Sequence, residues 1–272
     1  FKVPWMDKAA AEVFTQGVLQ VSSGMFDLGG FSPVVLLGLV FAWLSIWYCI
    51  RHGVASVGKV VKYTVILLMF LILRAVTLPG ALEGLSYYLV PDWSKLLDIN
   101  VWAAAYGQIF FSLSILFSIM VAYGSYFGKD AEVTKDAMII GLADAGISFL
   151  SGFAAFETLG YLAQISGTPI AEMKHTGIML AFVTYPEALG QMPGGRFGVI
   201  LFSLIFFIML FTLAIDSAFS IIEAIITAFV DKFGWNKERT TFWFCVVGFC
   251  ASLIFATRVG LYWLDIVDHF VN

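Results

Sequence analysis

The chain has 272 residues, of which 60% are hydrophobic and only 12% are charged, and its formal net charge is −4. Soluble domains carry about 25% charged residues, so a chain this apolar cannot cover itself with a surface that suits water. The composition excludes an ordinary soluble protein and predicts lipid as the main solvent. The small acidic charge indicates no nucleic-acid partner.

The N-terminal stretch has no secretory signal pattern. The sequence opens on Phe1 rather than Met, and charged residues follow at Lys2, Asp7 and Lys8. The first long apolar run begins only near Val34. We therefore expect the sequence to start inside a larger protein.

Long apolar runs recur along the rest of the chain. A helix needs about 20 residues to cross the hydrocarbon core of a bilayer. Six segments reach this length, some only with their flanks, and a seventh starts near the end: 34–50, 60–78, 101–127, 137–165, 197–229, 241–256 and 261–271. Backbone groups cannot stay unpaired in lipid, so these runs predict an all-α bundle of membrane-spanning helices.

The loops between the spans differ in charge. Three short loops, which follow the first, third and fifth spans, hold eight of the fifteen Lys and Arg: Arg51, Lys59, Lys62, Lys129, Lys135, Lys232, Lys237 and Arg239. Such loops are typically cytoplasmic. The connections 79–100 and 166–196, and both ends of the chain, are then outside. We predict a multi-pass protein of the plasma (inner) membrane.

Polar residues crowd the centre of the third span. Gln108, Ser112, Ser114 and Ser118 lie there within eleven residues. Serine hydroxyls in a membrane can join two helices, or they can take over backbone groups that a helix break sets free. The segment alone leaves both interpretations open.

Acidic residues lie inside the fourth and fifth spans. Asp216 is close to the middle of its span, where a carboxylate costs several kcal/mol and needs a cation, a proton or water. Asp144 lies seven residues into its span, so it can bind a ligand or reach toward the membrane surface. Glu157 and Glu223 fit either a vestibule or a structural role. No His or Lys lies near Asp216, and we expect no enzyme.

Four segments carry a resemblance to a known family. They are the run 101–114, the loop 91–96, the run 181–186 with 192–195 after it, and the run 212–217. Together they resemble the sodium-coupled neurotransmitter and amino-acid transporter family, in its bacterial branch. The resemblance covers nearly the whole chain, which is similar to family helices four to nine and the start of ten.

The resemblance implies a fold of two inverted repeats of five helices, here incomplete. Residues 1–272 would form a single transmembrane domain. Its parts would be an extracellular segment at 1–33, the last two helices of the first repeat at 34–79, and most of the second repeat at 101–272. The third span would be the broken helix of the second repeat, with its break around residues 112–117.

The resemblance also implies site residues. The substrate pocket would be lined by Phe111, Ser114, Phe117, Ser217 and Ile221. Sodium would be held by Ser112, Asp144, Leu213, Asp216 and Ser217. Chloride, where it binds, would contact Gln108, Ser112 and Ser148. Tyr126 and Asp231 would belong to a cytoplasmic gate.

The chain departs from the family pattern in two ways. The family has Asn where Asp144 stands, and this carboxylate would repel chloride, supply its negative charge, or carry a proton. Glycines are usual in the break, where this chain has Leu116 and Ser118.

The function implied is sodium-coupled symport of an amino acid or related amine by alternating access. The partners would be that small molecule, the lipid bilayer and the missing helices of the same transporter. The alternative is a non-transporting membrane receptor or regulatory protein with the same fold. We expect the isolated chain not to transport, because half of each site would lie on helices that it lacks.

Overall fold

The computed structural model describes residues 10–27, 29–52, 54–126, 128, 132–172 and 177–271. This part of the chain is helical, and its one β-type pairing is an isolated bridge between Phe31 and Thr257. The chain divides into two compact units. The first unit contains residues 1–58, 175–203 and 235–272, and the second contains residues 59–174 and 204–234.

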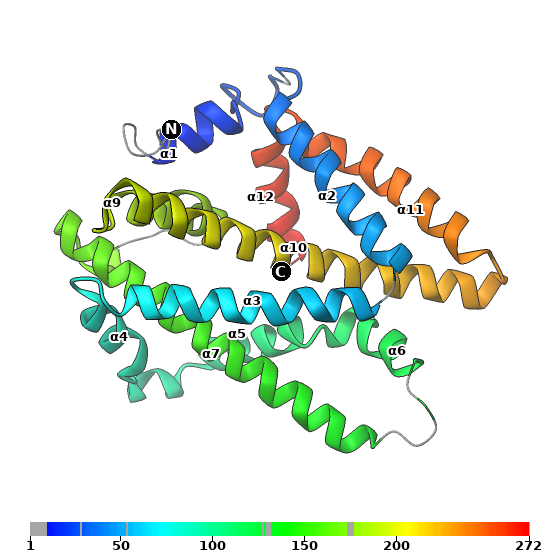
Figure 1. The fold of residues 1–272 in the computed structure, drawn as a ribbon, viewed down its shortest axis with the longest axis horizontal. Coiled ribbons are helices and arrows are strands. Elements are labelled where there is room, and N and C mark those ends of the chain that lie inside the picture. The colour runs from blue at the N-terminus through cyan, green and yellow to red at the C-terminus, as the bar shows by residue number, and fades with distance from the viewer. Residues whose placement is uncertain are drawn as a thin grey trace. The chain divides into compact units, whose positions relative to one another are not determined.

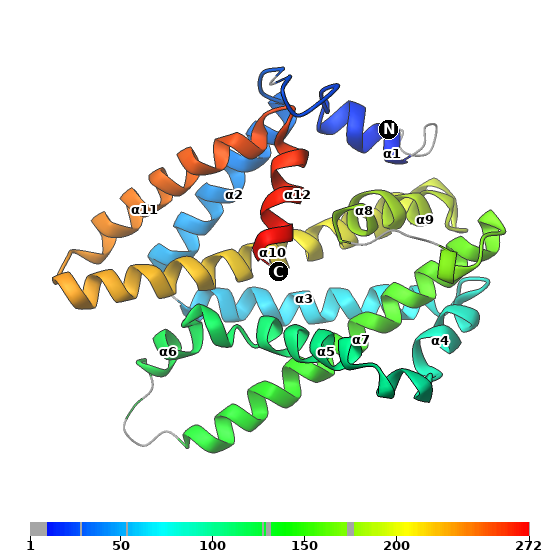
Figure 2. The same cartoon turned by 180° about the vertical axis from the view of Figure 1, so that it is seen from behind.

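A helix pair forms the centre of the first unit. Helix α2 (Pro33–His52) and helix α11 (Lys237–Ser252) lie side by side (Figures 1 and 2). The indole of Trp43 lies over Gly248, where any larger residue would collide with it. Its Nε1 also donates to Ser252 Oγ at 3.3 Å. The turn η7 (Leu253–Ala256) then leads to helix α12 (Gly260–Val271).

The N-terminal segment is tied to the connection between α11 and α12. After α1 (Ala10–Glu12) and the π-helical turn η2 (Val13–Val18), Ser32 Oγ donates to the carbonyl of Val18 at 2.6 Å. The amide of Arg258 donates to the carbonyl of Gly30 at 3.0 Å, and the amide of Ser22 donates to the carbonyl of Arg258 at 3.1 Å. This segment is therefore ordered by backbone pairing.

The second unit contains the broken helix. Its elements are α3 (Val54–Ala75), α4 (Ala81–Leu89), η3 (Trp93–Leu97), α5 (Ile99–Ser112), η4 (Ile115–Phe117), α6 (Ile119–Gly124), α7 (Val133–Ser166), η5 (Ile170–Glu172) and most of α10 (Gly195–Phe233). Helices α3 and α10 are joined by a hydrogen bond between the hydroxyls of Thr64 and Thr212, 2.9 Å apart.

Helices α4 and α7 make an unusually close crossing. A side chain at Gly84 would collide with the carbonyl of Phe156, and one at Gly160 would collide with the carbonyl of Gly80. Only hydrogen at these positions lets the two backbones approach this closely. The ring of Tyr88 stacks on that of Phe156, with centroids 4.8 Å apart.

Both long connections contain helices that the sequence did not predict. Residues 79–100 form α4 and η3. The connection at 166–196 includes η5, α8 (Gly177–Met179), the π-helical turn η6 (Leu180–Thr184) and α9 (Tyr185–Gln191). Each is shorter than a span, which is why a search for long apolar runs passes over them.

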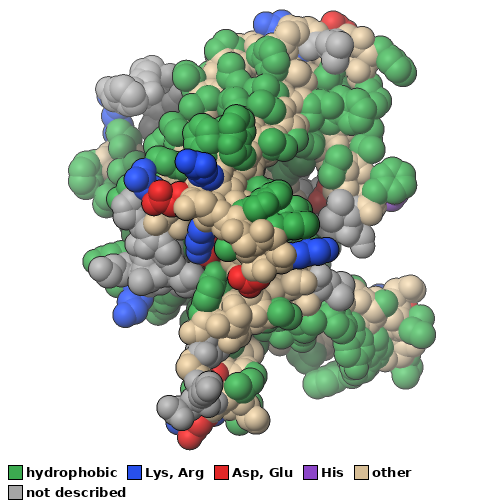
Figure 3. All heavy atoms as spheres, turned by 90° about the vertical axis from the view of Figure 1, so that its right-hand side faces the viewer, with side chains coloured by type: hydrophobic (Ala, Val, Ile, Leu, Met, Phe, Trp, Pro, Cys, Tyr) green, Lys and Arg blue, Asp and Glu red, His purple; other side chains and the backbone are tan. Residues whose placement is uncertain are grey.

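Four described helices are long and apolar enough to cross a membrane: Pro33–Arg51, Val133–Ser166, Gly195–Phe233 and Lys237–Ala256. They match the predicted first, fourth, fifth and sixth spans. The predicted second span is the 22-residue α3, and the predicted third span is divided between α5 and α6. Hydrophobic side chains cover much of the surface in Figure 3, as expected of helices in lipid. The chain is a multi-pass membrane protein.

Candidate cation and substrate site

The site is built around the interruption of the third span. Helix α5 ends at Ser112, and α6 begins at Ile119. Between them Ser114 has φ 53° and Ser118 has φ 57°, which is left-handed backbone. This conformation costs an L-residue about 1–2 kcal/mol. The structure confirms the predicted break, and Ser118 adopts a conformation that glycine takes more easily.

The two helix ends at the break expose backbone groups. The last carbonyls of α5 and the first amides of α6 cannot all pair within their own helices. Carbonyl oxygens attract cations, and amides at a helix start attract anions. A break inside a membrane protein can therefore hold a small ion and the charged end of an organic molecule.

Ser112 and Asp144 meet across two helices. Ser112 Oγ, at the end of α5, donates to Asp144 Oδ2 on α7 at 2.7 Å. The structure thus brings this predicted pair together and points the Asp144 carboxylate at the break. Both residues are half-buried, so the carboxylate is neither freely solvated nor enclosed.

The remaining members of the predicted anion set lie apart. Gln108 and Ser148 are exposed, and neither has a hydrogen bond to Ser112 in the described part of the chain. Ser148 lies one helical turn after Asp144, on the same face of α7. Its carbonyl accepts from Ser151 Oγ at 2.8 Å.

Helix α6 packs against α10 directly after the break. Ile119, Ala122 and Ala224 are buried together. The Tyr123 hydroxyl lies 2.7 Å from Ser220 Oγ, and Ser220 Oγ in turn donates to the carbonyl of Asp216 at 3.0 Å. Tyr123 is thus connected to the backbone of Asp216 through one serine.

The register of this packing places Asp216 near the break. Tyr123 is paired with Ser220, and Tyr126 further along is paired with Glu223, so the numbers rise in the same direction on both helices. Asp216 lies one turn before Ser220, about 6 Å along the axis. It therefore lies at the level of Ile119, where α6 begins. The Asp216 carboxylate accepts no hydrogen bond from the described residues.

The other predicted site residues form two groups, one at the break and one on α10. The rings of Phe111, at the end of α5, and Phe117, within the break, meet edge to face with 5.6 Å between their centroids. On α10, the exposed residues Leu213, Ser217 and Ile221 flank Asp216. No described hydrogen bond or ring contact joins Phe111 or Phe117 to α10.

The predicted gate residues have different surroundings. Tyr126 donates to Glu223 Oε1 at 2.9 Å, and its hydroxyl lies 2.8 Å from Thr227 Oγ1. Asp231 is exposed near the end of α10, about 12 Å beyond Glu223 along the axis. Tyr126 therefore contacts Glu223 rather than Asp231. Glu223 lies within an apolar span, and this position is the sequence signal that could have identified it. The sequence analysis left its role open between a vestibule and a structural function.

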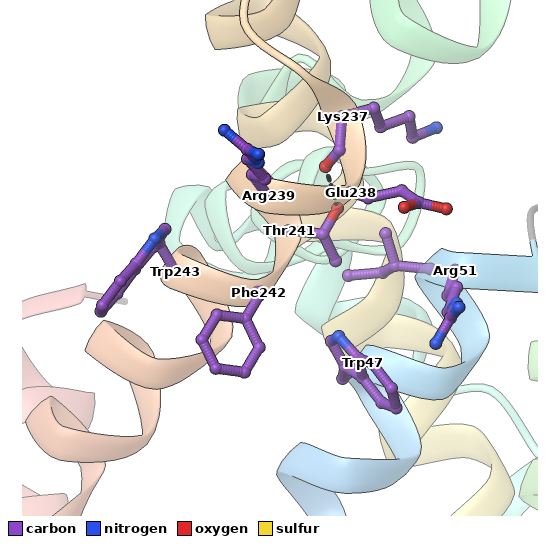
Figure 4. Close-up of a pocket in the computed structure, with 9 residues that line it drawn as sticks. Trp47, Arg51, Lys237, Glu238, Arg239, Thr241, Phe242 and Trp243 are labelled. Carbon is purple, nitrogen blue, oxygen red and sulfur yellow. Dashed lines mark hydrogen bonds between the residues drawn. The ribbon is translucent and has the colours of Figure 1, made fainter.

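The first unit has a hollow of about 480 Å³ between the end of α2 and the start of α11. It is lined by Trp47, Ile50, Arg51, Lys237, Glu238, Arg239, Thr241, Phe242 and Trp243. Figure 4 shows Arg51 and Arg239 on opposite sides of the first turn of α11. Because these cations do not converge, we regard the hollow as part of a polar membrane boundary with tryptophans, rather than as a ligand site.

Comparison with known proteins identifies the family. Residues 3–272 match the Sodium:neurotransmitter symporter family. The chain belongs to this family, which consists of symporters rather than enzymes.

Its relatives include an uncharacterized sodium-dependent transporter of Methanocaldococcus jannaschii, 42% identical over 95% of this chain and 53% of the relative. A sodium- and chloride-dependent taurine transporter of Canis lupus familiaris is 38% identical over 95% of this chain and 43% of the relative. The sodium- and chloride-dependent neutral and basic amino acid transporter B(0+) of Mus musculus is 39% identical over 93% of this chain and 40% of the relative. The chain thus spans about half the length of these relatives.

A solved structure shares the fold. The crystal structure of MhsT in complex with L-phenylalanine matches 92% of this chain and 56% of that chain, with a TM-score of 0.66 and 25% sequence identity. The predicted fold class, an incomplete inverted-repeat bundle of membrane helices, is confirmed by this match.

Proposed function

We propose that this chain is the central part of a sodium-coupled symporter for an amino acid or related amine, working by alternating access. The observation that carries the proposal is the left-handed break at Ser114 and Ser118, with Asp144 on one side and Asp216 level with it on the other. Three relatives are described as sodium-dependent transporters, which supports sodium coupling.

The proposal includes two cation sites. In the first, Ser112 and Asp144 bind sodium beside the end of α5. In the second, the carbonyl of Leu213 binds sodium with Asp216 and Ser217. Hard cations take oxygen ligands and usually need several of them. The remaining oxygens would come from the helices of the longer polypeptide, the partners that this chain requires.

The substrate would bind beside these cations at the break. The backbone groups at Ser114 would contact the substrate there. Phe111 and Phe117 form an aromatic edge on which an organic side chain can pack. Ser217 and Ile221 would face it from α10. The complex of MhsT contains an aromatic amino acid, which supports an amino acid as the class of substrate.

The charge of Asp144 affects whether chloride can bind. The Ser112 hydroxyl already donates to this carboxylate, and a fixed negative charge beside Ser112 would disfavour an anion at Gln108, Ser112 and Ser148. We propose that Asp144 replaces chloride in this protein. Uptake should then be unchanged when chloride is exchanged for gluconate, and Asp144→Asn should make uptake chloride-dependent.

The gate and the membrane placement complete the proposal. Tyr126 and Glu223 would close the cytoplasmic side, with Asp231 at its rim. Residues 1–272 would act as one transmembrane domain of the plasma (inner) membrane, with 1–33 outside and 34–79 and 101–272 belonging to the two repeats. The basic loops at the ends of α2 and α10 support the cytoplasmic assignment.

The test is uptake of radiolabelled amino acids by the complete transporter in liposomes, with and without an inward sodium gradient. Accumulation only with the gradient is expected, and indifference to sodium would reject the proposal. Substrate binding that sodium strengthens, without any flux, would instead favour a receptor or regulatory protein of the same fold. The isolated 272-residue chain should show no uptake.

A further inference from the structure

Glu157 is a buried acid that the cation site does not use. It lies in α7 and is 1% exposed. Neither of its carboxyl oxygens has a hydrogen-bond partner in the described part of the chain. Thirteen residues separate it from Asp144, which is about 20 Å along a helix, so it belongs to a different site.

The surroundings of Glu157 come from the α4–α7 crossing and the end of α3. Its neighbour Phe156 stacks on Tyr88 of α4. The titratable and charged groups nearby are Glu83, Tyr87 and Tyr88 from α4, Tyr161 on α7 and Arg74 from α3.

None of these groups neutralises the Glu157 carboxyl. The Tyr88 hydroxyl donates to the carbonyl of Phe149 at 3.3 Å, and Arg74 donates to Thr77 Oγ1 at 2.6 Å. Arg74 acts electrostatically on Tyr161, one turn beyond Glu157, and no ion pair joins Arg74 to Glu157 among the described residues.

A helix from a longer polypeptide would not reach the Glu157 carboxyl to pair with it. The side chain of Glu157 is already covered by residues of this chain, so a further helix would meet a closed surface there. A metal ion is also disfavoured, because the described residues contain no group of three His, Cys, Asp or Glu that could hold one. An ionised carboxylate without a partner in such a place is very unfavourable, whereas the neutral acid is much less so.

We propose that Glu157 is a proton-binding site: the folded protein holds it as a neutral carboxylic acid near neutral pH. The ligand is a proton taken up from water. The proton forms an O–H bond on the carboxylate, and the protein then has one negative charge fewer. Because the folded state binds a proton that the unfolded chain releases, stability should fall as the pH rises through this site. The proposal is independent of the transported substrate.

Infrared spectroscopy of the complete transporter tests this directly. At about pH 6 a glutamate with the ordinary pKa of about 4.3 is ionised, so a carbonyl band of a protonated acid reports an unusual site. We expect such a band in the wild type, its loss in Glu157→Gln, and its retention in Glu83→Gln, which changes an exposed acid on α4.

Two outcomes would overturn the proposal. Identical acid bands in wild type and Glu157→Gln would show that Glu157 is ionised. A loss of carboxylate intensity in Glu157→Gln would have the same meaning and would point to an ion pair with Arg74. If Glu157→Gln does not fold, the wild type labelled with ¹³C-glutamate keeps the proposal falsifiable, because the absence of a labelled acid band at about pH 6 would overturn it.

A second measurement separates a proton site from a packing role. The midpoint of thermal unfolding of the wild type should fall between about pH 6 and pH 8 by more than that of Glu157→Gln. Parallel pH dependence of the two proteins would contradict proton binding at Glu157. Uptake does not enter either experiment, so failure of the proposed transport function would leave both results interpretable.

Discussion

Two regions of the second unit use the backbone in opposite ways. At the break between α5 and α6, serines hold left-handed conformations, and the surrounding side chains are half-buried or exposed. At the crossing of α4 and α7, glycines bring two backbones into contact, and the residues between them are buried. The first region leaves polar backbone available to ligands, and the second removes all space for them.

The two regions meet different physical demands. Close backbone contact at the crossing gives van der Waals packing, which is the main source of helix association in lipid. We propose that the conformational cost at the break is retained because it creates a place for ions. Substitutions in the two regions should therefore change different observables.

The largest effect on stability is expected at the crossing. Gly160→Ala places a methyl group against the backbone of Gly80 and Gly84, and it should lower the free energy of unfolding by about 3 kcal/mol. Gly146→Ala is the matched control on the same helix, because nothing lies within 4 Å of its added carbon. The control should be neutral or more stable by up to about 1 kcal/mol. If Gly160→Ala and Gly146→Ala change the free energy of unfolding in detergent equally, the backbones of α4 and α7 are not in close contact at the crossing.

A smaller effect on stability is expected just after α6, on the C-terminal side of the break. Tyr126→Phe removes the donor to Glu223, an acid that is 1% exposed, and should cost about 1–3 kcal/mol. Tyr106→Phe, on the exposed face of α5, should change the free energy of unfolding by less than about 0.5 kcal/mol. If chemical unfolding shows no difference between these two variants, the Tyr126–Glu223 contact does not stabilise the packing of α6 on α10.

The smallest effect is expected at the break itself and has the opposite sign. Ser118→Gly relieves left-handed backbone and should raise the free energy of unfolding by about 1 kcal/mol. Ser151→Gly, in the regular helix α7, should lower it by about 0.5 kcal/mol. A loss of stability in both variants would mean that Ser118 is not strained.

The sequence was sufficient to predict the parts of this architecture that depend on polarity. Apolar length predicted the spans. The serines between Ser112 and Ser118 allowed either helix contact or a helix break, and the family resemblance predicted the break. The apolar run left two positions open for Asp144; the family resemblance paired it with Ser112, and Ser112 donates to it.

Other features depend on contacts that polarity does not encode. Helix α4 is nine residues long, and its importance comes from Gly84, whose role is visible only opposite Phe156 and Gly160. Glu223 and Asp231 are both acids near the end of one helix, and only the register of α6 on α10 shows that Tyr126 contacts Glu223. The isolation of Glu157 likewise depends on its neighbours across the crossing.

The central claim is that Asp216 binds a cation beside the break. Binding of radiolabelled sodium to the complete transporter in detergent tests it most directly, with Asp216→Asn compared with wild type and with Glu83→Gln. We predict sodium affinity at least about tenfold weaker in Asp216→Asn, a loss of at least about 1.4 kcal/mol, because the neutral amide lacks the charge that attracts the cation. The affinity should be unchanged in Glu83→Gln. Equal sodium affinity in all three proteins would contradict the account.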